Sequence, residues 1–458
     1  MQATKYNSEL LFTAEEMRDK RWEQFIGTKL GQLFLTIPFQ EIASRYPKPK
    51  DNPSGTVPFF KLEGGIALMF LKSYYNGMSD EKLVESINGN WMLQLFCQMR
   101  LGTGEKIKDR GIVSRWRKYL GVHLQEEEIQ QVLLEEWRED IEDTHSNVSD
   151  ATCYESYVRY PTDVKLLWEG VDWLHRQMIA LCSYTRSTHP RNKFKEIKGA
   201  YLSYSKSRKK TYKKRRRMQR RLLYLLDKLF GQIAPLIGLW KMGMRLGEKS
   251  PVRPDFFKRL SLVKKMYKQQ QLHYERPKDS IPNRIVSLAK PYLRPIVRGK
   301  ETKRVEFGKK VHKMMVGGIS FIEYGDYNAF HEGNRTIKTI WKHRSYFGQC
   351  RLFGGDQIYA TNKNRKYCSQ NNIFNCFKRK GKAGKNEKQA AQLRAIIAKE
   401  RSTVLEGSFG NEKNHYALNK VKARTEETEN VWIFFSIMTA NAMKIAKIRA
   451  MKNSKAPP

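Results

Sequence analysis

The strand-like segments of this chain lie far apart, and that separation most limits how the chain can fold. One short run of strand character lies at residues 148–153, and the next runs begin only near residue 281. Runs of β-branched and aromatic residues bounded by Gly and Pro are typical of strands. Such runs recur at residues 284–288, 294–298, 305–307, 319–323 and 372–376. Residues 163–280 have helical character, so the sequence predicts an α/β layered architecture with a helical block inserted after the first strand.

The region before the first strand has helical character. Helical segments are expected at residues 63–75, 80–97, 108–120 and 125–143, and Thr13-Ala-Glu-Glu16 has the pattern of a capping box. We therefore expect an all-α N-terminal domain over residues 1–145. The first strand follows in residues 146–162, the basic helical insertion covers residues 163–280, and the rest of the strand-bearing domain covers residues 281–458.

The net charge of the chain points to a polyanionic partner. Lys and Arg total 86 against 46 Asp and Glu, which gives a formal charge of +40. Charge of one sign opposes compaction unless a partner offsets it, and nucleic acid is the commonest such partner. A membrane partner is not expected, because the most apolar stretch, 222–240, contains Asp227, Lys228 and Pro235 and suits a buried helix better.

The N-terminus and the cysteines favour a cytoplasmic protein. The first residues, Met1-Gln-Ala-Thr-Lys-Tyr-Asn7, lack a basic segment followed by an apolar one, so secretion is not expected. The six cysteines form no C-x-x-C pair, which favours reduced thiols over a disulfide framework or a zinc site.

A run of basic residues at 206–221 leads directly into an apolar helical pattern beginning at Leu222. This continuity favours an ordered basic helix that follows a DNA backbone, whereas a solvated charged face remains the alternative. Contacts of this kind go to phosphates and depend on salt. The residues expected to make them are Lys213, Lys214, Arg215, Arg216, Arg217 and Arg220.

Three acidic residues are candidates for a metal centre. Asp150 and Asp356 lie in or at the end of strand-like runs, and Glu406 lies in a helical run. Phosphodiester cleavage by two magnesium ions needs carboxylates on rigid elements that meet in space. The chain can supply them, with Mg²⁺ as the expected metal and Mn²⁺ as a substitute. Four other acidic residues remain open as rivals: Asp143, Asp163, Asp326 and Glu332.

Two basic residues accompany Glu406. Lys413 follows it by seven residues and shares its helix face if the helix continues, where it could bind the phosphate next to the scissile bond. Arg401 precedes Glu406 by five residues. We expect both to contact DNA.

Several motifs in one order resemble a known family. They are Ser149-Asp150-Ala-Thr152, Tyr160-Pro-Thr-Asp-Val-Lys-Leu-Leu167, Arg294-Pro-Ile-Val-Arg-Gly-Lys300, Gly355-Asp-Gln-Ile-Tyr359 and Leu405-Glu-Gly-Ser-Phe-Gly-Asn-Glu-Lys413. Over nearly its whole length the chain resembles the DDE transposases of bacterial insertion sequences, which have a ribonuclease-H-like catalytic domain.

The resemblance implies a specific set of properties. Asp150, Asp356 and Glu406 would be the catalytic, metal-binding residues of a mixed five-stranded sheet flanked by helices. The N-terminal helices would bind the transposon ends. A homo-oligomer, expected to be a dimer on paired ends, would cut double-stranded DNA at terminal inverted repeats with Mg²⁺ and join the 3′ ends to target DNA.

The match to the family has departures, and two other functions stay open. Related proteins often carry Arg four positions before the glutamate, where Ser402 stands here, and Arg401 is one residue earlier. Asn328 and His331 replace the Asp and Asn expected in the segment before Glu332. The alternatives are a non-catalytic nucleic-acid-binding protein derived from a transposase and a structure-selective metal-dependent nuclease.

Overall fold

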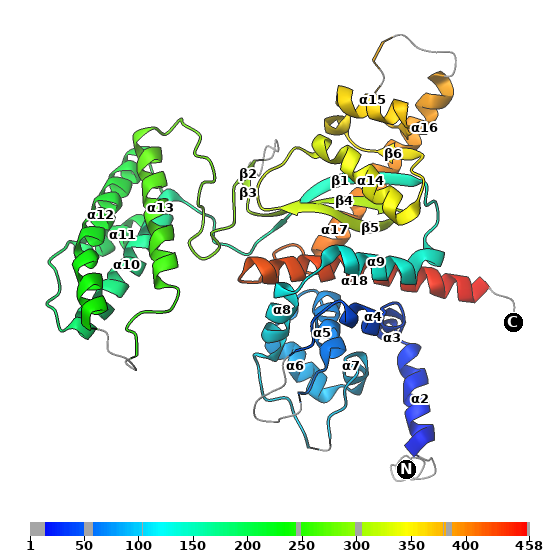
Figure 1. Cartoon of the computed structure of the whole chain (residues 1–458), viewed down its shortest axis with the longest axis horizontal. Coiled ribbons are helices and arrows are strands. Elements are labelled where there is room, and N and C mark those ends of the chain that lie inside the picture. Colours follow the sequence, from blue (N-terminus) through cyan, green and yellow to red (C-terminus); the bar gives the residue numbers. More distant parts are fainter. Residues whose placement is uncertain are drawn as a thin grey trace. The chain divides into compact units, whose positions relative to one another are not determined.

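The chain forms two compact units. The computed structural model describes residues 14–49, 58–102, 104–243, 249–297, 305–378, 380–381 and 387–455. One unit consists of Met1–Tyr157 with Lys309–Pro458, and the other of Val158–Gly308. Each has its own core of buried apolar side chains, and Figure 1 labels the elements of both units.

The first unit contains a mixed five-stranded sheet. Its strands are β1 (Ser146–Glu155), β4 (Gly308–Val316), β5 (Ile319–Asp326), β6 (Leu352–Gly354) and β7 (Phe374–Asn375), in the spatial order β5-β4-β1-β6-β7. β6 is parallel to β1 and to β7, whereas β4 and β5 are antiparallel. Gly317 and Gly318 join β4 to β5 with φ of 53° and 77°, which a tight two-residue hairpin requires.

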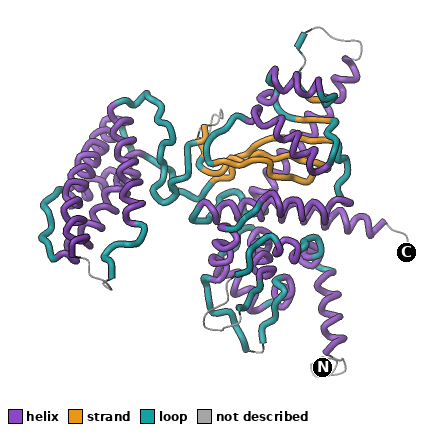
Figure 2. The backbone as a smooth tube through the Cα atoms, in the orientation of Figure 1, coloured by secondary structure: helices purple, strands orange, loops and turns teal. Residues whose placement is uncertain are grey.

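Helices flank this sheet (Figure 2), so the predicted α/β class and the mixed five-stranded sheet are confirmed. The flanking helices are α9 (Glu126–Trp137), α14 (Thr336–Phe347), α15 (Asn362–Gln370), α16 (Glu387–Glu400), α17 (Glu406–His415) and α18 (Glu426–Lys455). Short 3₁₀ turns, η1 (Arg138–Asp140), η2 (Glu332–Arg335) and η3 (Gln357–Tyr359), complete this layer.

Strand β4 was not expected from the sequence. It contains Lys309, Lys310, His312 and Lys313, so it lacks the alternation of apolar and polar residues by which a half-buried strand is recognised. Each of these side chains has an acidic partner in the fold, so the strand can be buried despite its charges. The strand expected at residues 284–288 is wrong, because that segment forms no strand.

The N-terminal helices share a core with the sheet. They are α2 (Ala14–Ile26), α3 (Lys29–Phe34), α4 (Phe39–Ser44), α5 (Leu62–Tyr74), α6 (Asp80–Gly89), α7 (Trp91–Phe96) and α8 (Ile112–Val122). Helix α18 packs against α5, α8 and β5, so it joins the helical layer to the sheet (Figure 1). The capping box at Thr13 begins outside the described residues.

The second unit is built mainly from four helices. They are α10 (Asp163–Thr185), α11 (Phe194–Lys206), α12 (Tyr212–Gly243) and α13 (Phe256–Glu275). The two-residue strands β2 (Ile296–Val297) and β3 (Val305–Glu306) pair with each other and do not join the five-stranded sheet. α12 packs closely against α10 through residues such as Leu222 and Leu226, which are fully buried.

Two of the described helices are long and apolar enough to cross a membrane by length and composition. Their apolar stretches lie in Tyr212–Gly243, where 39% is buried, and in Glu426–Ser454, where 72% is buried. Core helices of soluble proteins pass the same test, and α18 contributes Phe434, Phe435 and Ile437 to the core of the first unit. The expected lack of a membrane partner stays a prediction.

Candidate metal centre

Asp150 and Asp356 converge because of the register between two parallel strands. Val148 of β1 pairs with Gly354 of β6. Asp150 follows Val148 by two residues, and Asp356 follows Gly354 by two residues. Neighbouring parallel strands run in the same direction at a spacing of about 5 Å, so equal steps from a paired position bring the two carboxylates to the same end of the sheet.

Glu332 completes the cluster from a different element. It begins the 3₁₀ turn η2, which follows β5 and leads into α14, and its residue is 8% exposed. One oxygen from each of Asp150, Glu332 and Asp356 lies within 4.8 Å of the other two. Among the described residues, these three form an acidic group compact enough to share one metal ion.

The electrostatics of the cluster favour a bound cation. Burial raises the pKa of Asp150 to about 6, and the charges of Glu332 and Asp356 also raise it. The backbone N–H of Ala151, 2.8 Å from Asp150 Oδ1, and the Arg401 guanidinium act in the opposite direction. Lys310 Nζ lies 2.7 Å from Glu332 Oε1. An all-oxygen ligand set with excess negative charge suits a hard divalent ion.

Glu406 lies beside this cluster and is linked to it by Arg401. One guanidinium nitrogen of Arg401, Nη1, lies 3.1 Å from Asp150 Oδ2 and 2.9 Å from Glu406 Oε1. The two carboxylates therefore face the same cation. The Glu406 side chain is 51% exposed, whereas that of Asp150 is 15% exposed. The structure thus brings Asp150 and Asp356 together in one ligand group with Glu332, and places Glu406 next to them.

A π-helical segment explains the position of Arg401. Residues Arg401–Leu405 form one π turn between α16 and α17, and the N–H of Glu406 donates to the carbonyl of Arg401. In a π turn the hydrogen bond spans five residues instead of four. Arg401 therefore reaches Glu406 from five positions away, as a residue four positions away would in an α-helix. Ser402, at the position where related proteins carry Arg, donates its hydroxyl to Lys399 O at 3.0 Å.

Lys413 faces β1 from α17. Its Nζ donates to Thr152 Oγ1 at 2.9 Å. Residues 150 and 152 share a face of β1 because side chains alternate along a strand. Glu406 and Lys413 both belong to α17, so the expected shared helix is present. The role of Lys413 in DNA binding stays a prediction.

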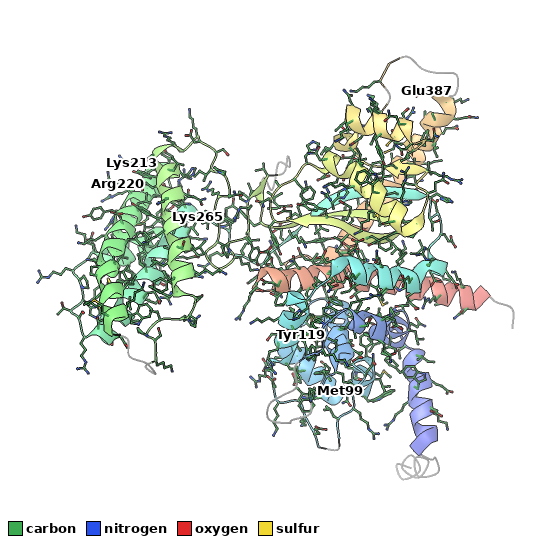
Figure 3. The ribbon with its side chains drawn as sticks, in the orientation of Figure 1. Met99, Tyr119, Lys213, Arg220, Lys265 and Glu387 are labelled. Atoms are coloured by element: carbon green, nitrogen blue, oxygen red, sulfur yellow. The ribbon has the colours of Figure 1, made fainter. Side chains whose placement is uncertain are left out.

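The residues of the basic run at 206–221 that are expected to bind DNA belong to the second unit. Lys213, Lys214, Arg215, Arg217 and Arg220 are exposed on α12, and Figure 3 labels Lys213 and Arg220 there. Arg216 differs, because its Nη1 lies 2.5 Å from Tyr274 O and its guanidinium lies 3.5 Å from the centre of the Tyr274 ring. Arg216 therefore attaches α12 to α13.

Of the four rival carboxylates, only Glu332 joins the cluster. Asp326 ends β5 and accepts a hydrogen bond from Asn328 N at 2.8 Å, as expected for a turn. Asp163 accepts a hydrogen bond from Arg284 at 2.6 Å in the second unit. The sequence offers one signal for Glu332: it follows the strand-like run at 319–323, so its side chain can lie near the end of the sheet.

Comparison with known proteins covers part of this site. Residues 354–442 match the family model of the transposase DDE domain. The match supports a DDE transposase. DDE transposases use divalent metals and act on DNA, and the matched segment includes Asp356, Arg401, Glu406 and Lys413. No curated protein and no solved structure matches the chain.

Proposed function

We propose that this chain is the transposase of a bacterial insertion sequence, which cuts DNA at terminal inverted repeats and transfers the 3′ ends to target DNA. One observation carries the proposal. Asp356, inside the segment that matches the transposase DDE domain, lies within 4.8 Å of carboxylate oxygens from Asp150 and Glu332, which both lie outside it. The ribonuclease-H-like arrangement of the catalytic domain belongs to the same proposal.

The proposed metal is Mg²⁺, with two ions per site and Mn²⁺ as a substitute. Asp150, Glu332 and Asp356 would hold the first ion, and Asp150 with Glu406 would hold the second. Bound in this way, the ions would activate the attacking oxygen and stabilise the leaving one. The residues present fit this demand, because the described ligand set consists of carboxylate oxygens alone.

Arg401 and Lys413 are proposed to meet the DNA backbone at the same site. Arg401 already bridges Asp150 and Glu406. When DNA binds at the carboxylates, a phosphate could replace them as the hydrogen-bond partner of the Arg401 guanidinium. Lys413 would contact the phosphate next to the scissile bond. The catalytic residues are then Asp150, Asp356 and Glu406, and Glu332 is added as a metal ligand.

DNA also has a proposed path along the second unit. Lys213, Arg217 and Arg220 are spaced by four and three residues, so they share a face of α12, and all three are exposed. Together with Lys214 and Arg215 they would neutralise phosphates. The N-terminal helices are proposed to bind transposon ends, and the active form is proposed to be a dimer on paired ends in the bacterial cytoplasm.

A strand-transfer assay tests the function. The substrate is a DNA fragment carrying the sequences that flank this gene, incubated with purified protein, Mg²⁺ and a supercoiled target plasmid. We expect cleavage at the ends and covalent joining of the 3′ ends to the plasmid, both dependent on the divalent ion. Cleavage without joining would show a structure-selective nuclease. Binding without cleavage in Mg²⁺ or Mn²⁺ would show a non-catalytic DNA-binding protein.

A salt titration tests the proposed path on α12. Replacing Lys213, Arg217 or Arg220 by Ala removes one phosphate contact, and each should lower the slope of log affinity against log salt by about 1. Arg216→Ala is the matched control, because Arg216 contacts Tyr274. It should lower the stability of the unit and leave the salt slope unchanged.

A further inference from the structure

A chain of buried polar side chains connects the two turns that carry Glu332 and Asp356. It begins at Arg335, the last residue of η2, whose first residue is Glu332. Arg335 Nε donates to Glu323 Oε2 at 3.0 Å, and Arg335 Nη2 donates to Glu323 Oε1. The guanidinium also lies 4.0 Å from the centre of the Tyr324 ring. The turn bearing Glu332 is therefore attached to β5.

The chain continues through the sheet to the turn that bears Asp356. His312 of β4 is fully buried, with Nδ1 3.0 Å from Glu323 Oε2 and Nε2 2.8 Å from Tyr359 Oη. Tyr359 is also fully buried and ends η3, the turn that Asp356 begins by accepting a hydrogen bond from Ile358 N at 2.8 Å. Four side chains thus connect one metal-site turn to the other.

The chemistry of Glu323 fixes the direction of its hydrogen bond with His312. Burial alone would raise the pKa of Glu323, but hydrogen bonds from His312 and Arg335 outweigh it and hold this pKa below its ordinary value. An ionised carboxylate only accepts hydrogen bonds, so His312 Nδ1 donates to Glu323. The other ring nitrogen of His312, Nε2, lies 2.8 Å from the Tyr359 hydroxyl and forms the next hydrogen bond of the chain. Burial and the nearby carboxylates raise the pKa of Tyr359, so its hydroxyl keeps its proton.

Asn364 connects the same two turns a second time. Its Nδ2 lies 2.7 Å from Gly333 O, next to Glu332, and 2.8 Å from Tyr359 O. The residue is 3% exposed. An amide nitrogen has two hydrogens and can donate to both carbonyls at once. The route through Arg335, Glu323, His312 and Tyr359 and the route through Asn364 therefore close a ring.

We propose that Tyr359, His312 and Asn364 are positioning residues that set the spacing between Asp356 and Glu332 and so the affinity of the site for its divalent ion. The inference rests on the proposed function. None of the three needs to touch the ion or the DNA. They act by holding two turns, one on each side of the cluster, in a single arrangement, and partners behind metal ligands typically change affinity by about 10- to 100-fold.

Mn²⁺ binding to the DNA-free, full-length protein tests this inference, with free Mn²⁺ followed by electron paramagnetic resonance. Tyr359→Phe removes one oxygen and should weaken binding by about 10-fold or more. Tyr346→Phe is the matched control, because Tyr346 is 3% exposed and its hydroxyl donates to Glu127 at 2.7 Å. It should leave Mn²⁺ affinity unchanged. Unchanged affinity in folded Tyr359→Phe would overturn the proposal.

A double-mutant cycle separates positioning from general loosening of the fold. His312→Asn keeps a donor toward Glu323 and loses the ring nitrogen that hydrogen-bonds to Tyr359. If the hydrogen bond between His312 and Tyr359 is what acts, the double variant His312→Asn with Tyr359→Phe loses no more affinity than either single variant. Additive losses would overturn the proposed link. At saturating Mn²⁺, we expect the cleavage rate of Tyr359→Phe to recover, while the Mn²⁺ concentration for half-maximal rate stays raised.

Asn364→Ala tests the second link and decides the question if Tyr359→Phe does not fold. Asn441→Ala is its control, because Asn441 is 5% exposed and its Nδ2 donates to Ser320 O at 2.7 Å. Weaker Mn²⁺ binding by Asn364→Ala alone supports the inference, and equal binding by both overturns it. Asp356→Ala identifies the site itself. If Asp356→Ala binds Mn²⁺ as the wild type does, the proposed function fails together with the inference. If Asp356→Ala loses Mn²⁺ binding and Asn364→Ala keeps it, only the inference fails.

Discussion

Two sides of the carboxylate site are held in different ways. On one side, Asp356 and Glu332 begin turns that buried side chains tie to the sheet and to each other. On the other side, Glu406 follows a π turn, is 51% exposed and receives a hydrogen bond from Arg401. The contrast favours a group of Asp150, Glu332 and Asp356 that is arranged before any metal binds, and under the proposed function Glu406 would become a ligand only when Arg401 leaves it.

The largest expected effect tests whether the preformed side is the catalytic one. Asp150→Ala and Asp356→Ala each remove a metal ligand, so the rate of DNA cleavage should fall by more than about 100-fold, beyond the loss seen for residues behind a ligand. Binding of end DNA should change little, since few DNA contacts are lost. Gel-shift and nicking assays on the same DNA measure both quantities.

Asp326→Asn is the control for these two variants, because Asp326 ends β5 in a turn outside the cluster. It should cleave at nearly the wild-type rate. Equal loss of DNA binding in Asp150→Ala and Asp356→Ala would contradict a catalytic role, since it would mean that the two aspartates shape the DNA-binding surface.

A second experiment compares the two glutamates directly. Glu332→Gln should weaken Mn²⁺ binding to the DNA-free protein by at least about 10-fold, because it removes a ligand of the preformed group. Glu406→Gln should leave that binding nearly unchanged and still abolish cleavage, because Glu406 is needed only for the second ion. If Glu406→Gln weakened Mn²⁺ binding and Glu332→Gln did not, the comparison would fail. Glu332 would then act only as the ion-pair partner of Lys310.

The third effect concerns stability and pH in the metal-free protein. The pKa of Asp150 in the folded state is about 6, above the ordinary 3.8. Its contribution to stability is therefore complete below about 3.8 and is lost as the pH rises through about 6. Asp150→Asn avoids this loss, so at pH 7 the variant should be more stable than the wild type by about 3 kcal/mol.

The difference between Asp150→Asn and the wild type should shrink at pH 4 and in saturating Mn²⁺, as urea unfolding can measure. Asp140→Asn is the control of opposite sign. Burial alone would raise the pKa of Asp140, but hydrogen bonds from Arg449 and Lys452 outweigh it and hold this pKa low. Asp140→Asn should therefore lose stability at neutral pH. A metal-free Asp150→Asn variant less stable than the wild type at pH 7 would show that the cluster is not strained by its charge.

The sequence predicted the preformed side only in part, and the reason is where each residue lies. Asp150 and Asp356 could be chosen because each lies in or at the end of a strand-like run, and the register of β1 with β6 brings them together. Glu332 was only a rival, because five residues separate it from the end of β5 and that spacing does not show that the segment returns to the end of the sheet. β4 was missed because its polar side chains are buried by partners distant in sequence.

The position of Arg401 next to Glu406 could not be predicted from the sequence for a different reason. Arg401 lies one residue earlier than the Arg of related proteins, and the π turn compensates for this shift. Whether a helix accommodates an extra residue as a π turn depends on packing: Leu405 and Phe409 lie with Val148 and Met315 in a small buried cluster. That packing holds the C-terminal end of the turn. The contact between Arg401 and Glu406 therefore depends on tertiary structure, which spacing along one segment does not reveal.

The smallest effect tests whether Arg401 occupies the place of a cation. Arg401→Gln removes the positive charge between Asp150 and Glu406. Partly exposed ion pairs are worth about 0.2–1 kcal/mol, so Mn²⁺ affinity of the DNA-free protein should rise by only about 1.5- to 5-fold. Cleavage should nevertheless fall, because Arg401 is proposed to contact the DNA backbone. Arg394→Gln, which removes an arginine paired with Glu387 on α16, should change neither quantity. Weaker Mn²⁺ binding by Arg401→Gln would mean that the guanidinium orders the carboxylates instead of competing with the ion, and the two sides of the site would then be held in the same way.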